Sequence, residues 1–174
     1  MSDLFEDTIY LKSPDNKYRY ALGTKGEKTL YCIGINPSTA TPEKYDPTIT
    51  RVSRTAKKLG FDSFVMLNIC PFRATDPDDL PQDKNITQEQ INRNIILDLI
   101  KDSSTIWCTW GDSINKRPYL KYYLKNIFTQ IDVCRKDIKW VKMGDLTKSG
   151  NPRHPLYLKY QPFSEFKIGE NNGA

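Results

Sequence analysis

The chain has 174 residues, of which 38% are hydrophobic and 27% charged, and its formal net charge is +5. This suffices for one sizeable core, so we expect a single domain over residues 1–166 and a disordered tail over 167–174. Residues 1–7 are acidic and contain no cationic start followed by an apolar run. We therefore expect neither a secretory signal nor a membrane span, and a cytoplasmic protein.

Two strands are the first elements expected, at Tyr18–Leu22 and Leu30–Ile35, where β-branched and aromatic residues alternate. Because a turn sequence with two glycines separates them, we expect the strands to pair as a hairpin. Apolar residues recur at helical spacing over Asp46–Leu59, which predicts a helix. Phe64–Asn68 is a short apolar run ending in a polar residue, as is typical of a central strand.

The second half of the chain continues this alternation. Thr87–Asp102 opens with a capping-box pattern, and its predicted apolar stripe is Ile91, Ile95, Leu99 and Ile100. Thr105–Trp110 is predicted to be a buried strand and Asp112–Phe128 a helix, with Pro118 tolerable only near the helix start. Val133 and Trp140–Val141 suggest short later strands.

Alternation of strands and helices indicates an α/β fold, a three-layer sandwich in which helices flank a central, mostly parallel sheet. The ligand crevice of such a sheet lies outside the carboxyl ends of its strands. Four segments follow predicted strands or lie late in the chain, and we expect them to frame one pocket: Gly34–Ser38, Asn68–Arg73, Trp110–Gly111 and Arg153–Tyr157.

The first segment offers backbone and side-chain polar groups. Gly34 permits close approach of a ligand to the backbone, and Asn36 and Ser38 direct polar groups outward from a turn that proline stiffens. The alternative is that Asn-Pro-Ser is only a good turn sequence.

The second segment combines an amide, an aromatic ring and a guanidinium, supplied by Asn68, Phe72 and Arg73. An amide both donates and accepts, so this trio could recognise the edge of a base. The alternative is that Asn68 caps a loop.

The third and fourth segments add a strand-to-helix turn and a stiff basic loop. Backbone amides after Trp110 would favour an anion if a helix begins there. The only histidine, His154, stands between two prolines and beside Arg153, near Tyr157. A lone histidine is as often structural as functional in this setting, and here it could donate to a developing negative charge.

The sequence predicts no metal site and no cofactor. Cys32, Cys70 and Cys108 lie in apolar runs and Cys134 near a basic turn, without zinc-site spacing, so buried free thiols are the expected state. A metal-dependent hydrolase would need the acids at 76, 78, 79 and 83, which lack the glycine and the final glutamate of a calcium loop and favour a solvated acidic loop. Residues 71–81 are predicted to form a polar, acidic, exposed loop.

Charge is unevenly distributed along the chain. Residues 112–160 contain eleven Lys or Arg and four Asp, whereas residues 76–102 contain seven acids and three bases. This asymmetry is typical of a face that binds an anion, and a nucleic acid or nucleotide is the expected partner. An ordinary solvated surface is the alternative, and the oligomeric state is left open.

In chain order, these segments resemble the uracil-DNA glycosylase superfamily. Gly34–Pro37 is similar to the first motif of its mismatch-specific thymine/uracil branch, and Val65–Asn68 to the strand whose terminal asparagine reads uracil. Ile106–Gly111 is similar to an apolar strand ending in Trp-Gly, and His154–Leu156 to the start of the last, histidine-containing loop.

A closer resemblance, over about residues 10–160, is to a bacterial and phage family known as domain of unknown function 1643. It rests on Asn36–Ala40, Asp46–Ile49, Arg73–Pro77 and Arg153–Leu158. That family carries no settled activity, so the glycosylase interpretation comes from the more distant resemblance alone.

The glycosylase resemblance implies a uracil-DNA-glycosylase-like fold and catalytic roles for Asn36 and His154. Asn36 would position the water that attacks the deoxyribose carbon, and His154 would stabilise the departing base anion. Asn68 would pair with the flipped base, Phe72 would stack on it, and Arg153 with the lysines of residues 116–159 would hold phosphates.

The sequence also departs from that superfamily. The Ser-Pro that follows its His-Pro is absent, Tyr157 could replace the wedge of that loop, and no aspartate stands at the Asn36 position to activate water. The closer family's additional charged residues either belong to the pocket or form salt bridges between loops; they are Asp46, Arg51, Arg73, Asp76 and Arg153.

Two functions remain open from the sequence. One is an enzyme that acts on a nucleobase, nucleotide or DNA base, by cleavage of an N-glycosidic bond. The other is a non-catalytic module that binds a nucleotide or a nucleic acid through arginines and aromatic faces.

Overall fold

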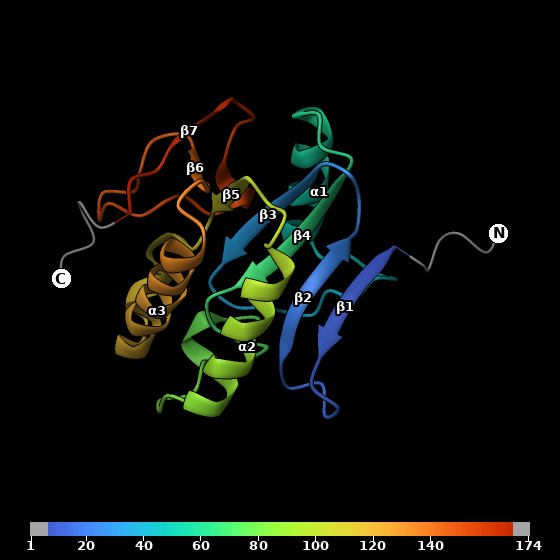
Figure 1. The fold of residues 1–174 in the computed structure, drawn as a ribbon. Helices are drawn as coiled ribbons and strands as arrows, with labels where there is room; N and C mark the ends of the chain where they lie inside the picture. The colour runs from blue at the N-terminus through green and yellow to red at the C-terminus, as the bar shows by residue number, and fades with distance from the viewer. Residues whose placement is uncertain (1–6, 169–174) are drawn as a thin grey trace.

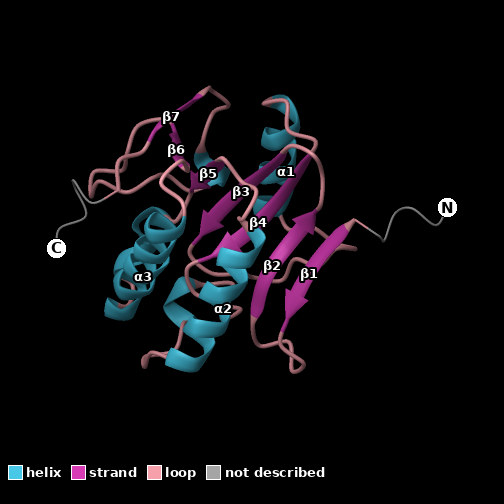
Figure 2. Ribbon diagram, viewed as in Figure 1, coloured by secondary structure: helices cyan, strands magenta, loops and turns pink. Residues whose placement is uncertain are grey.

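The computed structural model describes residues 7–168, and seven strands in this part of the chain form one sheet with helices on both faces (Figures 1 and 2). The strands are β1 (Thr8–Lys12), β2 (Arg19–Thr24), β3 (Thr29–Gly34), β4 (Ser63–Asn68), β5 (Thr105–Cys108), β6 (Lys139–Met143) and β7 (Phe163–Glu165). The helices are α1 (Pro47–Lys58), α2 (Ile86–Leu99) and α3 (Pro118–Cys134), with short 3-10 turns η1 (Pro77–Asp79), η2 (Gly111–Asn115) and η3 (Pro155–Tyr157). The expected tail lies almost entirely outside the described residues.

The sheet is mixed, with strand order β1-β2-β4-β3-β5-β6-β7. The pairs β4–β3, β3–β5 and β5–β6 are parallel, whereas β1–β2, β2–β4 and β6–β7 are antiparallel. The expectation of a mostly parallel sheet is therefore wrong. The alternation of strands and helices governs only the four central strands, and antiparallel strands extend the sheet at both edges.

The predicted hairpin of the first two strands is also wrong. β4 lies between β2 and β3, and β2 pairs instead with β1, which was not predicted. Gly23, one of the two glycines of the predicted turn, lies within β2. A Cβ at this position would lie 2.0 Å from the carbonyl oxygen of Phe64, so the glycine permits close approach of the neighbouring strand.

The first two helices were predicted, but the cap and buried face of α2 differ. Asp46 caps α1 by accepting a hydrogen bond from the Ile49 N–H at 2.8 Å. Asn85, rather than a capping box at Thr87, caps α2. Ile91 is exposed, and the buried residues of α2 include Glu89, Asn92 and Ile96. The predicted apolar stripe is therefore wrong in part.

The region from 111 to 134 divides into two elements. Residues 111–115 form the 3-10 turn η2, and α3 begins at Pro118, where its missing N–H costs no helical hydrogen bond. Val133 lies in α3 and is 77% exposed, so a strand at this residue is wrong. The strand predicted at Trp140–Val141 is confirmed as part of β6.

Helices cover the two faces of the sheet unequally, giving three layers. Ile49, Val52 and Ala56 of α1 pack in a core with β2, β3 and β4, while α2 and α3 pack on the opposite face (Figure 1). Within residues 7–168, no helix combines the length and apolarity needed to cross a bilayer.

Candidate functional site

A cleft of about 490 Å³ lies at the carboxyl ends of the central strands, within the range typical of small-molecule sites. β3 pairs with the later strand β4 on one side and with β5 on the other. The strand order thus reverses at β3, and an open α/β sheet binds its ligand at such a point. Residues from all four predicted segments line the cleft: Gly34, Asn36, Ser38, Asn68, Trp110, His154 and Tyr157.

Backbone hydrogen bonds lock the loop after β3 to the loop after β4. Asn36 Nδ2 donates to the carbonyl oxygens of Pro37 at 3.0 Å and Ala74 at 2.8 Å, and Ala74 N–H donates to Pro37 O at 2.9 Å. Ser38 Oγ donates to Thr75 Oγ1 at 3.2 Å. No described residue donates to Asn36 Oδ1, so this oxygen is held in place and left available to the cleft.

Asn68 presents a buried amide with an unpartnered donor. The residue is 1% exposed, and its Nδ2 has no hydrogen-bond partner among the described residues. Its backbone carbonyl is held by Asn92 Nδ2 of α2 at 2.8 Å. A Cβ on Gly34 would lie 3.1 Å from Asn68 Oδ1 and 2.7 Å from Met66 Cε. The glycine therefore allows Met66 and this amide to pack closely against the end of β3, and a larger residue would displace them.

The third and fourth segments are joined by hydrogen bonds. Gly111 has φ +60°, a conformation that glycine adopts without strain, and its N–H donates to Pro152 O at 2.8 Å. Asp112 Oδ1 accepts from Thr147 Oγ1 at 2.6 Å and Asn151 Nδ2 at 2.9 Å. These hydrogen bonds lower the pKa of Asp112. The carboxylate thus fixes the loop that leads to the histidine.

His154 is held as a neutral imidazole. Its Nδ1 accepts a hydrogen bond from the Leu156 N–H at 3.3 Å, so the neutral ring carries its proton on Nε2. Burial lowers the pKa of His154, an effect that the negative charge of Asp46 opposes. At neutral pH the ring can therefore donate one hydrogen bond from Nε2 to a ligand in the cleft.

Asp46 and Arg19 add two charges to the cleft lining. Asp46 uses Oδ1 to cap α1, and no described residue donates to Oδ2. Arg19 is 2% exposed; burial and the neighbouring charge of Arg73 lower its pKa to about 10, so it stays protonated at pH 7. The Asp-Pro-Thr-Ile motif had singled out Asp46, whereas Arg19 lies within a strand and gave no signal.

Phe72, Arg73 and Arg153 do not line the cleft. Phe72 packs edge-on against Tyr18 on the α2 side of the sheet. Arg73 donates to Ser38 O at 2.6 Å and Tyr10 Oη at 2.7 Å, so it clamps the wall of the cleft from behind. Arg153 donates to Asp145 O at 2.8 Å and is exposed.

Salt bridges between loops were one of the two alternatives for five charged residues, and the structure shows other contacts for them. Arg73, Arg153 and Arg51 bind backbone carbonyl oxygens, the last that of Leu158. Asp46 and Asp76 cap α1 and η1. Arg73 and Arg51 therefore connect distant segments through the backbone, and the four ion pairs in the described part of the chain include none of these five residues.

The aromatic residues Trp110 and Tyr157 both line the cleft, but the first is buried and the second is exposed. The Trp110 ring packs against Phe128 and Phe166 and is 1% exposed, so it belongs to the core beneath the cleft. Tyr157 is 87% exposed at the mouth of the cleft and 6.2 Å from the His154 ring. Of these two residues, only Tyr157 offers an aromatic face to solvent.

The described residues contain four free cysteines and no metal-binding cluster. In residues 7–168 no three His, Cys, Asp or Glu side chains lie close enough to hold a metal ion. Cys32, Cys70 and Cys108 are free and buried, as predicted, whereas Cys134 is exposed. Burial raises the pKa of Cys32 to about 12 and that of Cys70 to about 11, so these thiols stay protonated.

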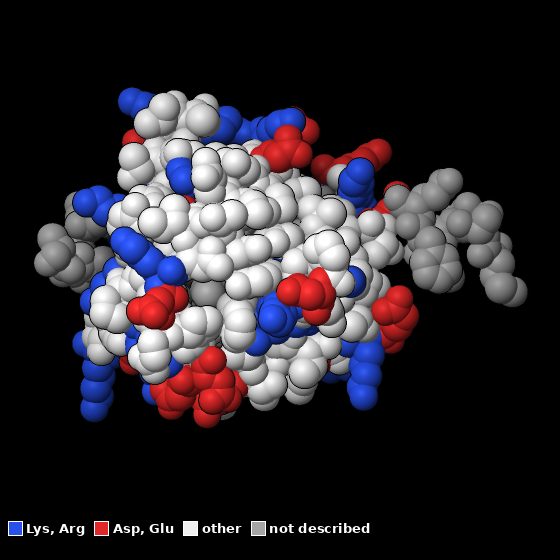
Figure 3. All heavy atoms as spheres, turned by 90° about the horizontal axis from the view of Figure 1, so that it is seen from below, with Lys and Arg blue, Asp and Glu red and all other residues white. Residues whose placement is uncertain are grey.

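Lysines of residues 116–159 do not gather at the cleft. Lys116 pairs with Asp78 at 2.8 Å, and Lys142 Nζ donates to Gly144 O. The face seen in Figure 3 carries both signs of charge, interspersed at its edges and across its lower half, beside a wide uncharged area. The uneven distribution of charge along the sequence is therefore not a single-sign surface on this face.

Comparison with known proteins shows the family. Residues 19–156 match the model of a family described as "Protein of unknown function (DUF1643)", and this match covers most of the chain and every residue that lines the cleft except Tyr157. No curated protein and no solved structure matches the chain. The chain therefore belongs to the DUF1643 family.

Proposed function

We propose that the cleft binds a nucleobase, within a nucleotide or a nucleic-acid strand, and hydrolyses its N-glycosidic bond. The observation that carries this proposal is the buried, unpartnered amide of Asn68 in the same cleft as the neutral His154 imidazole. A buried amide donor without a partner costs free energy that a ligand acceptor would recover. Both residues also stand at positions that resemble the motifs of the uracil-DNA glycosylase superfamily.

Asn68 would recognise the base. Its amide both donates and accepts, which matches the adjacent carbonyl and N–H groups on the edge of a pyrimidine. Gly34 lets this amide lie close to the end of β3, where a Cβ would approach its Oδ1 to 3.1 Å. The rigid wall formed by the loops after β3 and β4 would keep the base in one orientation.

The reaction would add one water molecule across the glycosidic bond. The bond between the base nitrogen and C1′ breaks with its electron pair moving to the base, and the water oxygen bonds to C1′. Asn36 Oδ1 would orient the water, and Asp46 Oδ2 would accept its proton. His154 Nε2–H would donate to the base as negative charge develops there, and the base nitrogen finally takes a proton.

The test is a mass-spectrometric screen for free base after incubation with single- and double-stranded DNA containing uracil or modified bases, and with free nucleotides. Removal of one preorganised donor typically lowers the rate 100- to 1,000-fold, and we expect this for His154→Ala. Asp46→Asn is the sharpest variant. Asn caps a helix as well as Asp does, so a loss of rate reports the carboxylate and not the helix.

A second candidate function, binding without catalysis, is favoured by two observations. Asn36 Nδ2 donates to two backbone carbonyls, so Asn36 has a structural role in the loop that does not depend on catalysis. The histidine-containing loop also lacks the Ser-Pro of the resembling superfamily. Wild-type protein that binds nucleotides or oligonucleotides but releases no base from any substrate would favour this function over hydrolysis.

A further inference from the structure

A second hollow of about 510 Å³ adjoins the cleft and is rich in positive charge. Pro47 and Leu156 line both, so the two hollows are adjacent. We call this hollow the basic groove, and its lining residues are Tyr45, Pro47, Thr50, Arg51, Arg54, Thr55, Lys58, Leu156 and Tyr160.

Three cations line the basic groove without acidic partners. Arg51, Arg54 and Lys58 lie on one face of α1, and the lining contains no Asp or Glu. None of the ion pairs in the described part of the chain includes these three residues. The positive charge of the basic groove is therefore uncompensated and available to an anion.

The arrangement of these cations is unfavourable for the helix itself. Arg51 and Arg54 are three residues apart and Arg54 and Lys58 four apart, and like charges at these spacings repel each other. The negative end of the helix dipole accounts for Lys58 in the last turn, but Arg51 and Arg54 lie before that turn. A bound polyanion would relieve this repulsion.

Partly exposed apolar side chains surround the same groove. Tyr45 and Tyr160 are 36% and 44% exposed, and Leu156 is 39% exposed. Lys58 Nζ lies 4.8 Å from the centroid of the Tyr160 ring. Aromatic faces interleaved with cations are the combination that single-stranded nucleic acids require, since bases stack and phosphates pair with the cations.

We infer that the basic groove holds the backbone of a single-stranded nucleic acid whose adjacent nucleotide enters the cleft. This inference rests on the proposed function for its last step only, the entry of a base into the cleft. Arg54 and Lys58 would neutralise phosphates, and Tyr160 would stack on a base. Arg51 also binds the Leu158 carbonyl, so it positions the loop that separates the groove from the cleft.

The test measures binding of fluorescently labelled 20-nucleotide oligo(dT) and oligo(rU) by anisotropy over a range of salt concentrations. The test variant is Arg54→Ala/Lys58→Ala. The control is Lys121→Ala/Lys125→Ala, which removes the same charge from exposed positions of α3 on the opposite face of the sheet. Thermal melting confirms that both variants fold.

We expect the wild type to bind with a steep salt dependence. Each phosphate contact with a single strand contributes about 0.7 to the slope of log K against log salt, so the test variant should lose about 1.4 from this slope and bind at least about tenfold more weakly. The control should lose much less. Equal losses in both variants, or no binding by the wild type, would overturn the inference.

A second variant and a second readout separate this inference from the proposed function. Tyr160→Leu keeps apolar bulk but removes the flat ring, and loss of one stacked base corresponds to roughly 5- to 150-fold weaker binding. Base release is measured in parallel from free deoxyuridine and from a uracil-containing oligonucleotide. Binding that depends on the groove, without base release, would support the inference and reject hydrolysis. Base release from free deoxyuridine, without oligonucleotide binding, would support hydrolysis and reject the inference.

Discussion

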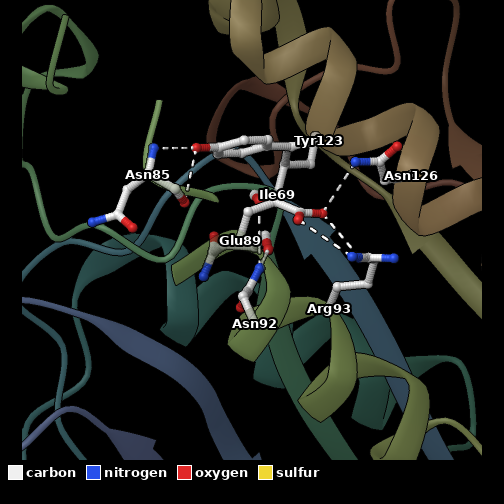
Figure 4. A network of polar contacts seen from close by, with 8 residues as sticks. Ile69, Asn85, Glu89, Asn92, Arg93, Tyr123 and Asn126 are labelled. Carbon is white, nitrogen blue, oxygen red and sulfur yellow. Dashed lines mark hydrogen bonds and ion pairs between the residues drawn. The ribbon is translucent and has the colours of Figure 1, made fainter. Parts of the chain in front are cut away.

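Polar side chains in the network between α2 and α3 have partners in the protein (Figure 4), whereas one polar donor in the cleft has none. In the network, Arg93 pairs with Glu89 at 3.0 Å, Asn126 donates to Glu89, and Tyr123 Oη accepts from Asn85 N–H at 2.8 Å. In the cleft, the amide donor of Asn68 has no partner. A buried group with partners in the protein stabilises the fold, whereas an unpartnered donor on a residue that lines a cleft can be satisfied by a ligand.

The largest expected effect on stability comes from breaking the network at its buried acid. Glu89→Ala leaves the Arg93 guanidinium, 17% exposed, without its counter-charge. Removing one partner of a fully buried pair costs roughly 3–5 kcal/mol, and we expect at least about 2 kcal/mol here, measured by urea unfolding. The control is Glu89→Leu/Arg93→Met, which removes both charges. A double variant no more stable than Glu89→Ala would contradict this account.

The next effect comes from Asn92, which connects the network to the cleft. Its Nδ2 donates to the carbonyl oxygens of Asn68 at 2.8 Å and Ile69 at 3.4 Å. Asn92→Ala leaves these buried carbonyls without their donor, so we expect a loss of about 1–3 kcal/mol in the free energy of unfolding. The matched control, Asn126→Ala, deletes an amide with one 3.4 Å contact. A larger loss of unfolding free energy in the control would show that Asn92 is not the residue that holds the end of β4.

Asn68→Ala should separate ligand binding from stability. The amide has no donor bond to lose, so we expect the free energy of unfolding to change by less than about 1 kcal/mol. Binding of a nucleoside or oligonucleotide should weaken at least about tenfold, because a site that hydrogen-bonds its ligand loses a pair of polar contacts. Calorimetric titration measures the binding. Strong destabilisation with unchanged binding would make Asn68 a structural residue.

The sequence predicted what depends on neighbouring residues and missed what depends on distant ones. The spacing of apolar residues in α1 and the apolar run of β4 are local patterns, and both elements formed as predicted. The partner of β2 depends on β4, about forty residues further along the chain, so no local signal favoured it over β3. In α2, the sequence predicted that apolar residues alone form the buried face. Glu89 and Asn92 are also part of that face.

The candidate site shows the same division. The rule that ligands bind at strand ends predicted Asn36 and Asn68, and both line the cleft, because the rule needs only the position of each strand. His154, which also lines the cleft, was selected as the only histidine in a stiff loop. It also selected Phe72 and Arg73, which follow β4 but point away from the cleft, since sequence does not give the direction of a loop. Arg19 was missed because it is the first residue of β2, and the rule considers only residues that follow a strand.

The smallest expected effect is a pH dependence carried by His154, the only histidine in the chain. Burial lowers its pKa in the folded protein below the ordinary value of 6.5, so the unfolded chain takes up a proton that the folded chain resists. Stability is therefore retained above about pH 7 and falls as the pH decreases through 6.5 toward the folded pKa, by no more than about 1.4 kcal/mol per pH unit for one proton. His154→Gln cannot take up this proton, and its unfolding free energy should change less than that of the wild type between pH 7.5 and 5.5. An identical pH dependence in both proteins would mean that the imidazole is solvated, which would also remove the desolvated Nε2 donor from the cleft.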